Sequence, residues 1–176
     1  MTLNTTLGAI DADAFVDFGQ VTNYATLRGL AWTVDQTAGE AAIRRATAYL
    51  SNSMTWQGLK VHGRNQALAW PRAGVWDDEG WGVPSTSIPI EIQNACCEAA
   101  VYELANPGGL TPTVVIADRV KRKRERVEGV VDEETEYAVS TPSAEDARPI
   151  LTLLEDMVSG LVARDVNPLA GASARR

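Results

Sequence analysis

The chain has 176 residues, of which 45% are hydrophobic and 22% are charged, and its formal net charge at pH 7 is -7. This composition is typical of one globular domain and excludes a disordered chain. No stretch approaches the roughly 20 apolar residues of a membrane span, and the first residues do not resemble a signal peptide. We therefore expect a soluble chain that is intracellular at synthesis and has no membrane partner. The net negative charge excludes a protein whose whole surface binds nucleic acid, and it limits any DNA contact to a local patch.

The N-terminal third predicts helices. Asp11 is a candidate cap for a short helix that passes through Phe15 and Phe18 and ends near Gly19, and a second short piece runs from 24 towards 30. A stronger pattern follows in DQTAGEAAIRRATAYLSNSM, which predicts a core helix of about five turns. Its apolar residues recur at helical spacing: Ile43, Ala46, Leu50 and Met54.

Between Thr55 and Ser87 the helical period stops and glycines and prolines follow closely. This long loop holds four of the five tryptophans, namely Trp56, Trp70, Trp76 and Trp81. Because loops of this length are usually functional or packed by their own side chains, we expect aromatic anchors here.

The segment QALAWPR within this loop has two interpretations. The favoured one places Trp70 in the core, with Pro71 fixing the turn and Arg72 packing its stem or capping a helix C-terminus. The alternative is an interface with another subunit, where tryptophan and arginine often dominate the binding energy. Trp76 and Trp81, flanked by acids and glycines, are the better interface candidates.

Two further helices are predicted. One begins at Pro89 and ends at the Asn-Pro-Gly run that starts at 106; its adjacent Cys96 and Cys97 are interpreted as small packing residues, because they lack the spacing of a zinc site. The last begins at Pro149, and the residues 163–176 after it are interpreted as a tail. The stripe predicted for the last helix comprises Ile150, Leu153, Leu154, Met157 and Leu161.

Between those helices, the sequence predicts a β-hairpin over about residues 118–139, with its turn near Gly129. The first half is basic and the second acidic, so opposite charges face one another when the segment folds back. Since a hairpin alone is marginal in water, we expect it to contact another chain. Its charged residues are Arg119, Lys121, Arg122, Lys123, Arg124 and Arg126, then Asp132, Glu133, Glu134 and Glu136. A nucleic-acid patch is the alternative interpretation of the basic run, although no aromatic residues are interleaved with it.

The sequence offers little for catalysis. The single histidine, His62, lies in a glycine-flanked loop and is interpreted as a surface residue. The common motifs of hydrolases, nucleotide-binding proteins and metalloproteases are absent from the sequence. The acidic clusters at 77–79 and 132–136 leave a metal-dependent nuclease open as a minor alternative, with Asp132 and Glu134 as its test residues. We otherwise expect no enzyme, no cofactor and no metal site.

Several segments, in order, resemble a known family: DADAFVDF, R-A-T-x-Y-L followed by W-x-G, Q-x-L-x-W-P-R, IPIEIQNACCEAAVYELA and the charged hairpin segment. They resemble phage proteins often labelled DnaT-like single-stranded DNA-binding proteins, a family similar to the head-tail connector, or adaptor, proteins of tailed bacteriophages. The resemblance covers residues of about 10–162. Its motif residues here are expected to be structural: Arg45, Tyr49, Trp56, Gly58, Gln66, Trp70, Pro71 and Arg72.

The resemblance implies a ring, usually of twelve copies, beneath the portal of a virion. Such a ring extends the channel through which double-stranded DNA passes without tight binding, and it docks a stopper or tail terminator protein. The protein would lie at the virion neck, and in the host cytoplasm during assembly. Hairpin residues, Trp76 and Trp81 would then form subunit contacts, and the tail would reach the portal. The tail residues expected to do so are Arg164, Asn167, Leu169, Arg175 and Arg176.

These observations predict a mainly α fold: a small helical bundle with a long aromatic loop and a projecting β-hairpin. One domain would span residues 1–162, followed by the tail at 163–176. The main functional prediction is a non-enzymatic head-tail adaptor of the virion, and the alternative is a phage single-stranded DNA-binding replication protein.

Overall fold

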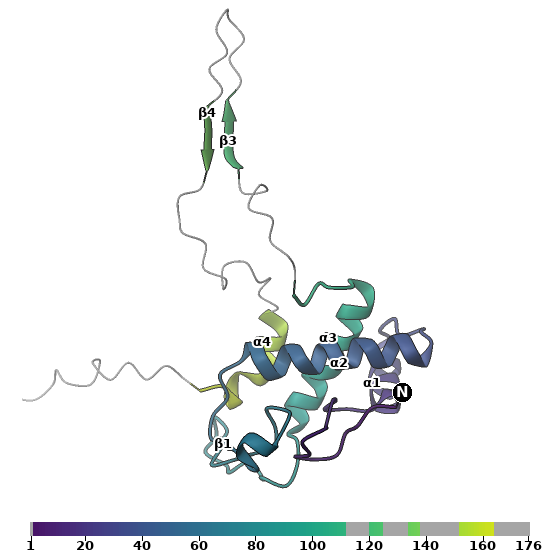
Figure 1. Ribbon diagram of the computed structural model, residues 1–176, viewed down its shortest axis with the longest axis vertical. Coiled ribbons are helices and arrows are strands. Elements are labelled where there is room, and N and C mark those ends of the chain that lie inside the picture. The colour runs from purple at the N-terminus through teal and green to yellow at the C-terminus, as the bar shows by residue number, and fades with distance from the viewer. Residues whose placement is uncertain (1, 112–119, 125–133, 138–151, 164–176) are drawn as a thin grey trace, which may run out of the picture.

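A computed structural model describes residues 2–111, 120–124, 134–137 and 152–163 (Figure 1). Several sequence predictions lie outside these residues, including the hairpin turn at Gly129, the start of the last helix and the tail. The predicted contact residues outside them are Arg119, Arg126, Asp132, Glu133, Arg164, Asn167, Leu169, Arg175 and Arg176.

The first helix, α1, spans Phe18–Arg28 as one element, so the prediction of two short helices with a cap at Asp11 is wrong. The cap is Asp17, whose carboxylate accepts a hydrogen bond from the Gln20 backbone at 2.7 Å, while the Gln20 side chain accepts one from the Asp17 backbone at 2.8 Å. This reciprocal capping box satisfies two backbone donors at the helix start. The helix ends where Gly29 adopts a left-handed conformation, with φ of 66°.

Helix α2 spans Gln36–Ser53, as the sequence predicts, and begins at an N-cap, Asp35, that accepts hydrogen bonds from two backbone amides. Helix α3 spans Ile90–Ala105 and follows Pro89, also as predicted. The two helices pack against each other, and small buried residues of α3, among them Ala95 and Cys96, let the backbones approach closely. Together they form the centre of the core, with α1 and α4 packed against α3.

Helix α4 spans Thr152–Val158 and continues into a 3-10 turn, Ser159–Leu161. The predicted apolar stripe needs correction, because Leu153 is 59% exposed whereas Val158 is buried. The buried positions are Leu154, Val158 and Leu161, which follow one face of a short helix at i, i+4 and i+7.

Two small antiparallel sheets complete the fold. Strand β1, Leu59–Lys60, pairs with β2, Arg72–Ala73, within the long loop, and β3, Val120–Arg124, pairs with β4, Glu134–Tyr137. Figure 1 shows β3 and β4 beyond one side of the helices and β1 beyond the other. The mainly α fold class is therefore confirmed. Within the described ranges, no helix has the length and apolar character needed to cross a membrane.

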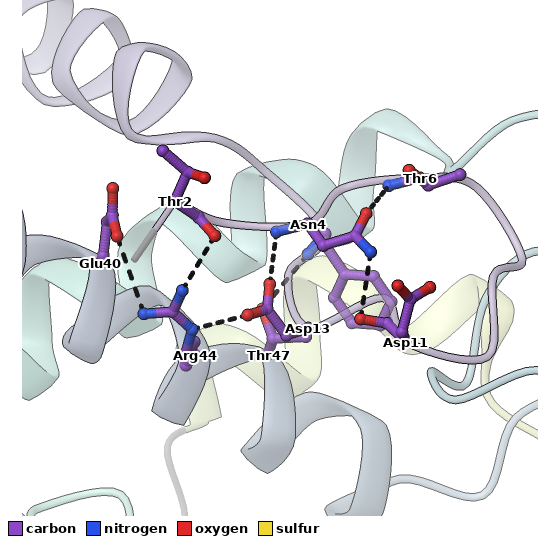
Figure 2. Close-up of polar contacts among 9 residues, drawn as sticks. Thr2, Asn4, Thr6, Asp11, Asp13, Glu40, Arg44 and Thr47 are labelled. Carbon is purple, nitrogen blue, oxygen red and sulfur yellow. Dashed lines mark hydrogen bonds and ion pairs between the residues drawn. The ribbon is translucent and has the colours of Figure 1, made fainter.

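The N-terminal segment is fastened to α2 by a polar cluster (Figure 2). The Arg44 guanidinium lies 2.7 Å from the Asp13 carboxylate and also donates to the backbone carbonyl of Thr2 at 3.3 Å. The second oxygen of Asp13 accepts a hydrogen bond from the Asn4 backbone at 2.7 Å. This cluster holds the segment across α2, which lets Phe15 reach the core.

Candidate functional site

The long loop is anchored to the core by two tryptophans. Trp70 is 1% exposed and Trp56 is 7% exposed, and their rings meet edge to face with centroids 5.6 Å apart. The backbone of Trp56 also pairs with Val162, beyond α4. Trp70 and Trp56 thus connect the start and the middle of the loop to the helical core, where each buries a large apolar surface.

Arg72 connects the start of this loop, residues 56–58, to its middle near Ala69. Its guanidinium donates hydrogen bonds to four backbone carbonyls, at 2.5 Å to Gln57, 2.6 Å to Gly58, 3.2 Å to Ala69 and 3.4 Å to Trp56. Burial lowers the pKa of Arg72 from its usual value. The side chain therefore satisfies loop carbonyls rather than a helix C-terminus, which is a role that the planar fork of arginine fits well.

Gln66 and Gly58 complete the anchor. The buried Gln66 amide donates to the carbonyls of Pro71, at 2.9 Å, and Leu68, at 3.0 Å. Gly58 has φ of 65°, and a Cβ at this position would collide with the carbonyl oxygen of Ala73. Only glycine fits there without strain.

Arg45 and Tyr49 lie on α2, away from the loop anchor. Arg45 forms an ion pair of 2.6 Å with Glu103 on α3, and Tyr49 is buried in the core. Glu103 is 1% exposed and also accepts hydrogen bonds from the backbone amides of Gly108, at 2.8 Å, and Leu110, at 3.3 Å. Glu103 thus fixes the turn after α3, a role that the sequence analysis did not assign to it.

Trp76 and Trp81 belong to a tight turn over residues 75–83, here called the tryptophan turn. The Val83 amide donates to the Val75 carbonyl at 2.9 Å, and the Asp77 carboxylate accepts from the Trp81 amide at 2.7 Å. Trp76 is 59% exposed and Trp81 is 71% exposed. Ordered backbone contacts therefore present two large aromatic surfaces to solvent.

A surface depression of about 520 Å³ lies beside Trp76. Gln57 holds its base, because the amide nitrogen donates to the Gly160 carbonyl at 3.0 Å and the amide oxygen accepts from the Trp76 backbone at 3.5 Å. The lining residues that the structure describes include two acidic side chains, and they are Gln57, Gly58, Gly74, Trp76, Asp77, Asp78 and Ala163. In the part of the chain that the structure describes, no group of three potential ligand side chains could hold a metal ion.

Charge is segregated along the chain. No Asp or Glu occurs from Ala41 to Trp76, and no Lys, Arg or His occurs from Ala73 to Asp118. Within the acid-free part, residues 61–65 are exposed and include His62 and Arg64. We call residues 59–66 the basic loop. His62 was interpreted alone as a surface residue, but Lys60 and Arg64 beside it give this loop a local excess of positive charge.

The register of β3 and β4 decides which charges of the hairpin face one another. Arg122 lies opposite Glu136 and Arg124 opposite Glu134, whereas Lys123 lies opposite Thr135. A register shift between Val120 and Arg122 leaves Lys121 without a directly opposite residue. Two of the four basic residues of β3 therefore have an acidic cross-strand partner, and the two lysines do not.

These features define a small, mainly helical protein with a net negative charge that exposes a basic loop and two tryptophan side chains. The chain belongs to the family described as "Putative DnaT-like ssDNA binding protein", whose family model matches residues 1–176. Comparisons with curated proteins and with solved structures gave no match.

The family match corrects the main functional prediction. It points to a DnaT-like single-stranded DNA-binding protein rather than a virion head-tail connector, so the characterisation as a portal-binding neck component in a dodecameric ring is wrong. The resemblance to the DnaT-like family is confirmed, and the match favours the alternative, single-stranded DNA binding, over the adaptor.

Proposed function

We propose that this protein binds single-stranded DNA through local basic segments on an otherwise acidic surface. The observation that carries the proposal is the match of the DnaT-like single-stranded DNA-binding family over residues 1–176. The charge pattern supports it, because phosphate contacts need only a local excess of Lys and Arg.

The phosphate contacts are assigned to β3 and the basic loop. In β3, Lys121 and Lys123 have no acidic residue opposite them, so the acidic strand β4 compensates only part of the positive charge. In the basic loop, Arg64 is exposed within a stretch free of acidic residues. These cations attract the backbone of any sequence, because phosphate contacts carry no sequence information.

Base stacking is assigned to Trp81. Its side chain is 71% exposed. Its backbone forms two hydrogen bonds with Asp77: the Trp81 amide donates to the Asp77 carboxylate, and the Asp77 amide donates to the Trp81 carbonyl. An aromatic side chain fixed at the surface provides a platform on which any base can stack.

The test is a fluorescence-anisotropy titration of a labelled, mixed-sequence single strand and of its duplex at several salt concentrations. We expect tighter binding of the single strand, with an affinity that falls as salt rises. Lys121→Ala combined with Lys123→Ala should lower the magnitude of the log–log salt slope by about 1.4, since each single-strand phosphate contact contributes about 0.7.

Arg64→Ala and Arg28→Ala form a matched pair. Each removes one arginine, but Arg28 lies at the end of α1 against the ring of Tyr24 and is not among the residues assigned to DNA contacts. Arg64→Ala should weaken binding more than Arg28→Ala. The proposal fails if the wild-type protein shows no salt-dependent binding of the single strand.

A further inference from the structure

We propose that the depression beside Trp76 is a nucleobase site that prefers bases with an exocyclic amino group, such as cytosine, over uracil and thymine. The inference rests on the proposed function, and it adds to that function a preference among bases. Trp76 provides the stacking surface, and Asp77 provides the acceptor for the amino group.

The ring of Trp76 forms a supported stacking surface. The side chain is 59% exposed, and the backbone of Trp76 pairs with Gly82 across the tryptophan turn. A Cβ added at Gly82 would lie 3.7 to 3.9 Å from three consecutive atoms of the six-membered ring, Cε3, Cζ3 and Cη2. Nearly equal distances to neighbouring ring atoms place Gly82 over one face of the ring rather than at its edge.

The depression lies away from the ring face that Gly82 covers. Its described lining includes Trp76 but not Gly82. Over Gly74, in the same lining, the space is open, because a Cβ added there would meet no heavy atom within 4 Å. The volume of about 520 Å³ falls within the range of small-molecule sites, roughly 300–1,000 Å³. A base can therefore enter from solvent and stack on the indole.

The carboxylate of Asp77 has one oxygen available to a ligand. Its Oδ1 atom accepts hydrogen bonds from the backbone amides of Glu79, at 3.0 Å, and Trp81, at 2.7 Å, which fixes the side chain in the turn. Among the residues that the structure describes, none donates a hydrogen bond to Oδ2. Asp78 already has another interaction partner, so the acceptor role is assigned to Asp77 alone. Asp77 thus presents a fixed acceptor in the lining of the depression.

A carboxylate oxygen distinguishes bases by the group that they present. The amino group of cytosine donates a hydrogen bond to it, whereas uracil and thymine carry a carbonyl oxygen at the same ring position. That carbonyl is an acceptor and cannot pair with a carboxylate. A phosphate group is repelled as well, because it carries the same sign of charge. The strand therefore meets this depression through a base and not through its backbone.

The experiment compares the binding of labelled oligo-dC and oligo-dU of equal length by fluorescence anisotropy at neutral pH and one salt concentration. The two strands carry the same phosphates, and their bases differ at the amino or carbonyl group. We expect oligo-dC to bind roughly two- to tenfold more tightly, the ratio that one net hydrogen bond supplies. Equal affinities would overturn the inference, while salt-dependent binding of both strands would leave the proposed function intact.

Asp77→Asn tests whether the preference arises in the depression. Asparagine keeps an oxygen for the amides of Glu79 and Trp81 but replaces Oδ2 with an NH₂ group, which donates to the uracil carbonyl. The preference for oligo-dC should disappear or reverse. Glu79→Gln is the matched control, because it removes the same charge from an exposed side chain of the same turn, outside the described lining. It should change both affinities alike, and a preference that survives in Asp77→Asn contradicts the assignment.

Free deoxycytidine tests the depression without phosphate contacts. In NMR spectra it should shift the indole N–H resonance of Trp76, which is identified by its loss in Trp76→Phe, and it should shift this resonance less in Asp77→Asn. If the nucleoside produces this shift but no single strand binds, the basic segments of the proposed function are wrong and the base site stands. If the nucleoside produces no shift and no strand binds, both proposals fail.

Discussion

Replacing Arg72 by lysine isolates the part of the loop anchor that depends on the shape of the guanidinium group. The substitution keeps the positive charge and much of the apolar stem. It removes the planar fork that reaches four backbone carbonyls from both limbs of the loop. Loss of stability in this variant therefore measures hydrogen bonds rather than net charge.

The expected magnitude follows from the two short hydrogen bonds, to Gln57 at 2.5 Å and to Gly58 at 2.6 Å. A lysine ammonium cannot replace both, while the contacts of 3.2 Å and 3.4 Å contribute less because they are longer. Hydrogen bonds from charged donors contribute about 1.5–3 kcal/mol each, and lysine regains part of this. We expect Arg72→Lys to lower the free energy of unfolding by about 2–3 kcal/mol.

Urea denaturation followed by circular dichroism measures this change, provided that the m-value stays the same. Arg64→Lys is the matched control, because Arg64 is exposed in the basic loop and should change stability by less than about 0.5 kcal/mol. Equal stability of the Arg72→Lys protein and the control would refute the view that Arg72 holds the loop.

Three further predictions test the core and the loop. Trp70→Ala should lower the free energy of unfolding by about 3–5 kcal/mol, whereas Trp81→Ala should change it by less than about 0.5 kcal/mol, as measured by chemical denaturation. Gly58→Ala should destabilise the fold more than Gly63→Ala, because both glycines have positive φ but only the first would meet a backbone oxygen; thermal melting compares them. Burial raises the pKa of Cys96 from 9.0 to about 12, so its stabilising contribution is complete below pH 9 and is lost as the pH rises towards 12. Cys96→Ala should therefore flatten the alkaline decline of stability, and an unchanged pH profile would contradict this assignment.

Helices with a strong apolar period could be predicted from the sequence. The residue that caps the first helix, however, was predicted incorrectly. α2 and α3 form where the pattern predicts them because each buries one continuous face. At the N-terminus both Asp11 and Asp17 are possible caps. The structure uses Asp17 because Gln20, three residues on, completes a capping box, and this signal was present in the sequence.

Buried charge was the least predictable part of the fold. Glu103 lies on α3 at 1% exposure, although an acidic residue is normally expected at the surface. Its carboxylate is paired with Arg45 from α2 and accepts hydrogen bonds from two backbone amides of the turn after α3. None of these partners lies three or four residues from Glu103 in the sequence, so the helical period does not predict them. Such a site needs the tertiary arrangement before its hydrogen bonds can be counted.

The candidate site could not be predicted from the net charge, because DNA binding depends on the local distribution of charge. The net charge of -7 favoured a protein that does not hold DNA, yet this sum combines an acid-free stretch up to Trp76 with a base-free stretch after Arg72. The hairpin was predicted to neutralise its own basic strand, but neutralisation depends on register, and the register leaves Lys121 and Lys123 outside the matched pairs. Since phosphate binding depends on the field near a few cations, screened over about 8–10 Å, the net charge of the chain is a poor guide to it. A net acidic chain is thus compatible with the proposed binding of single-stranded DNA through local basic segments.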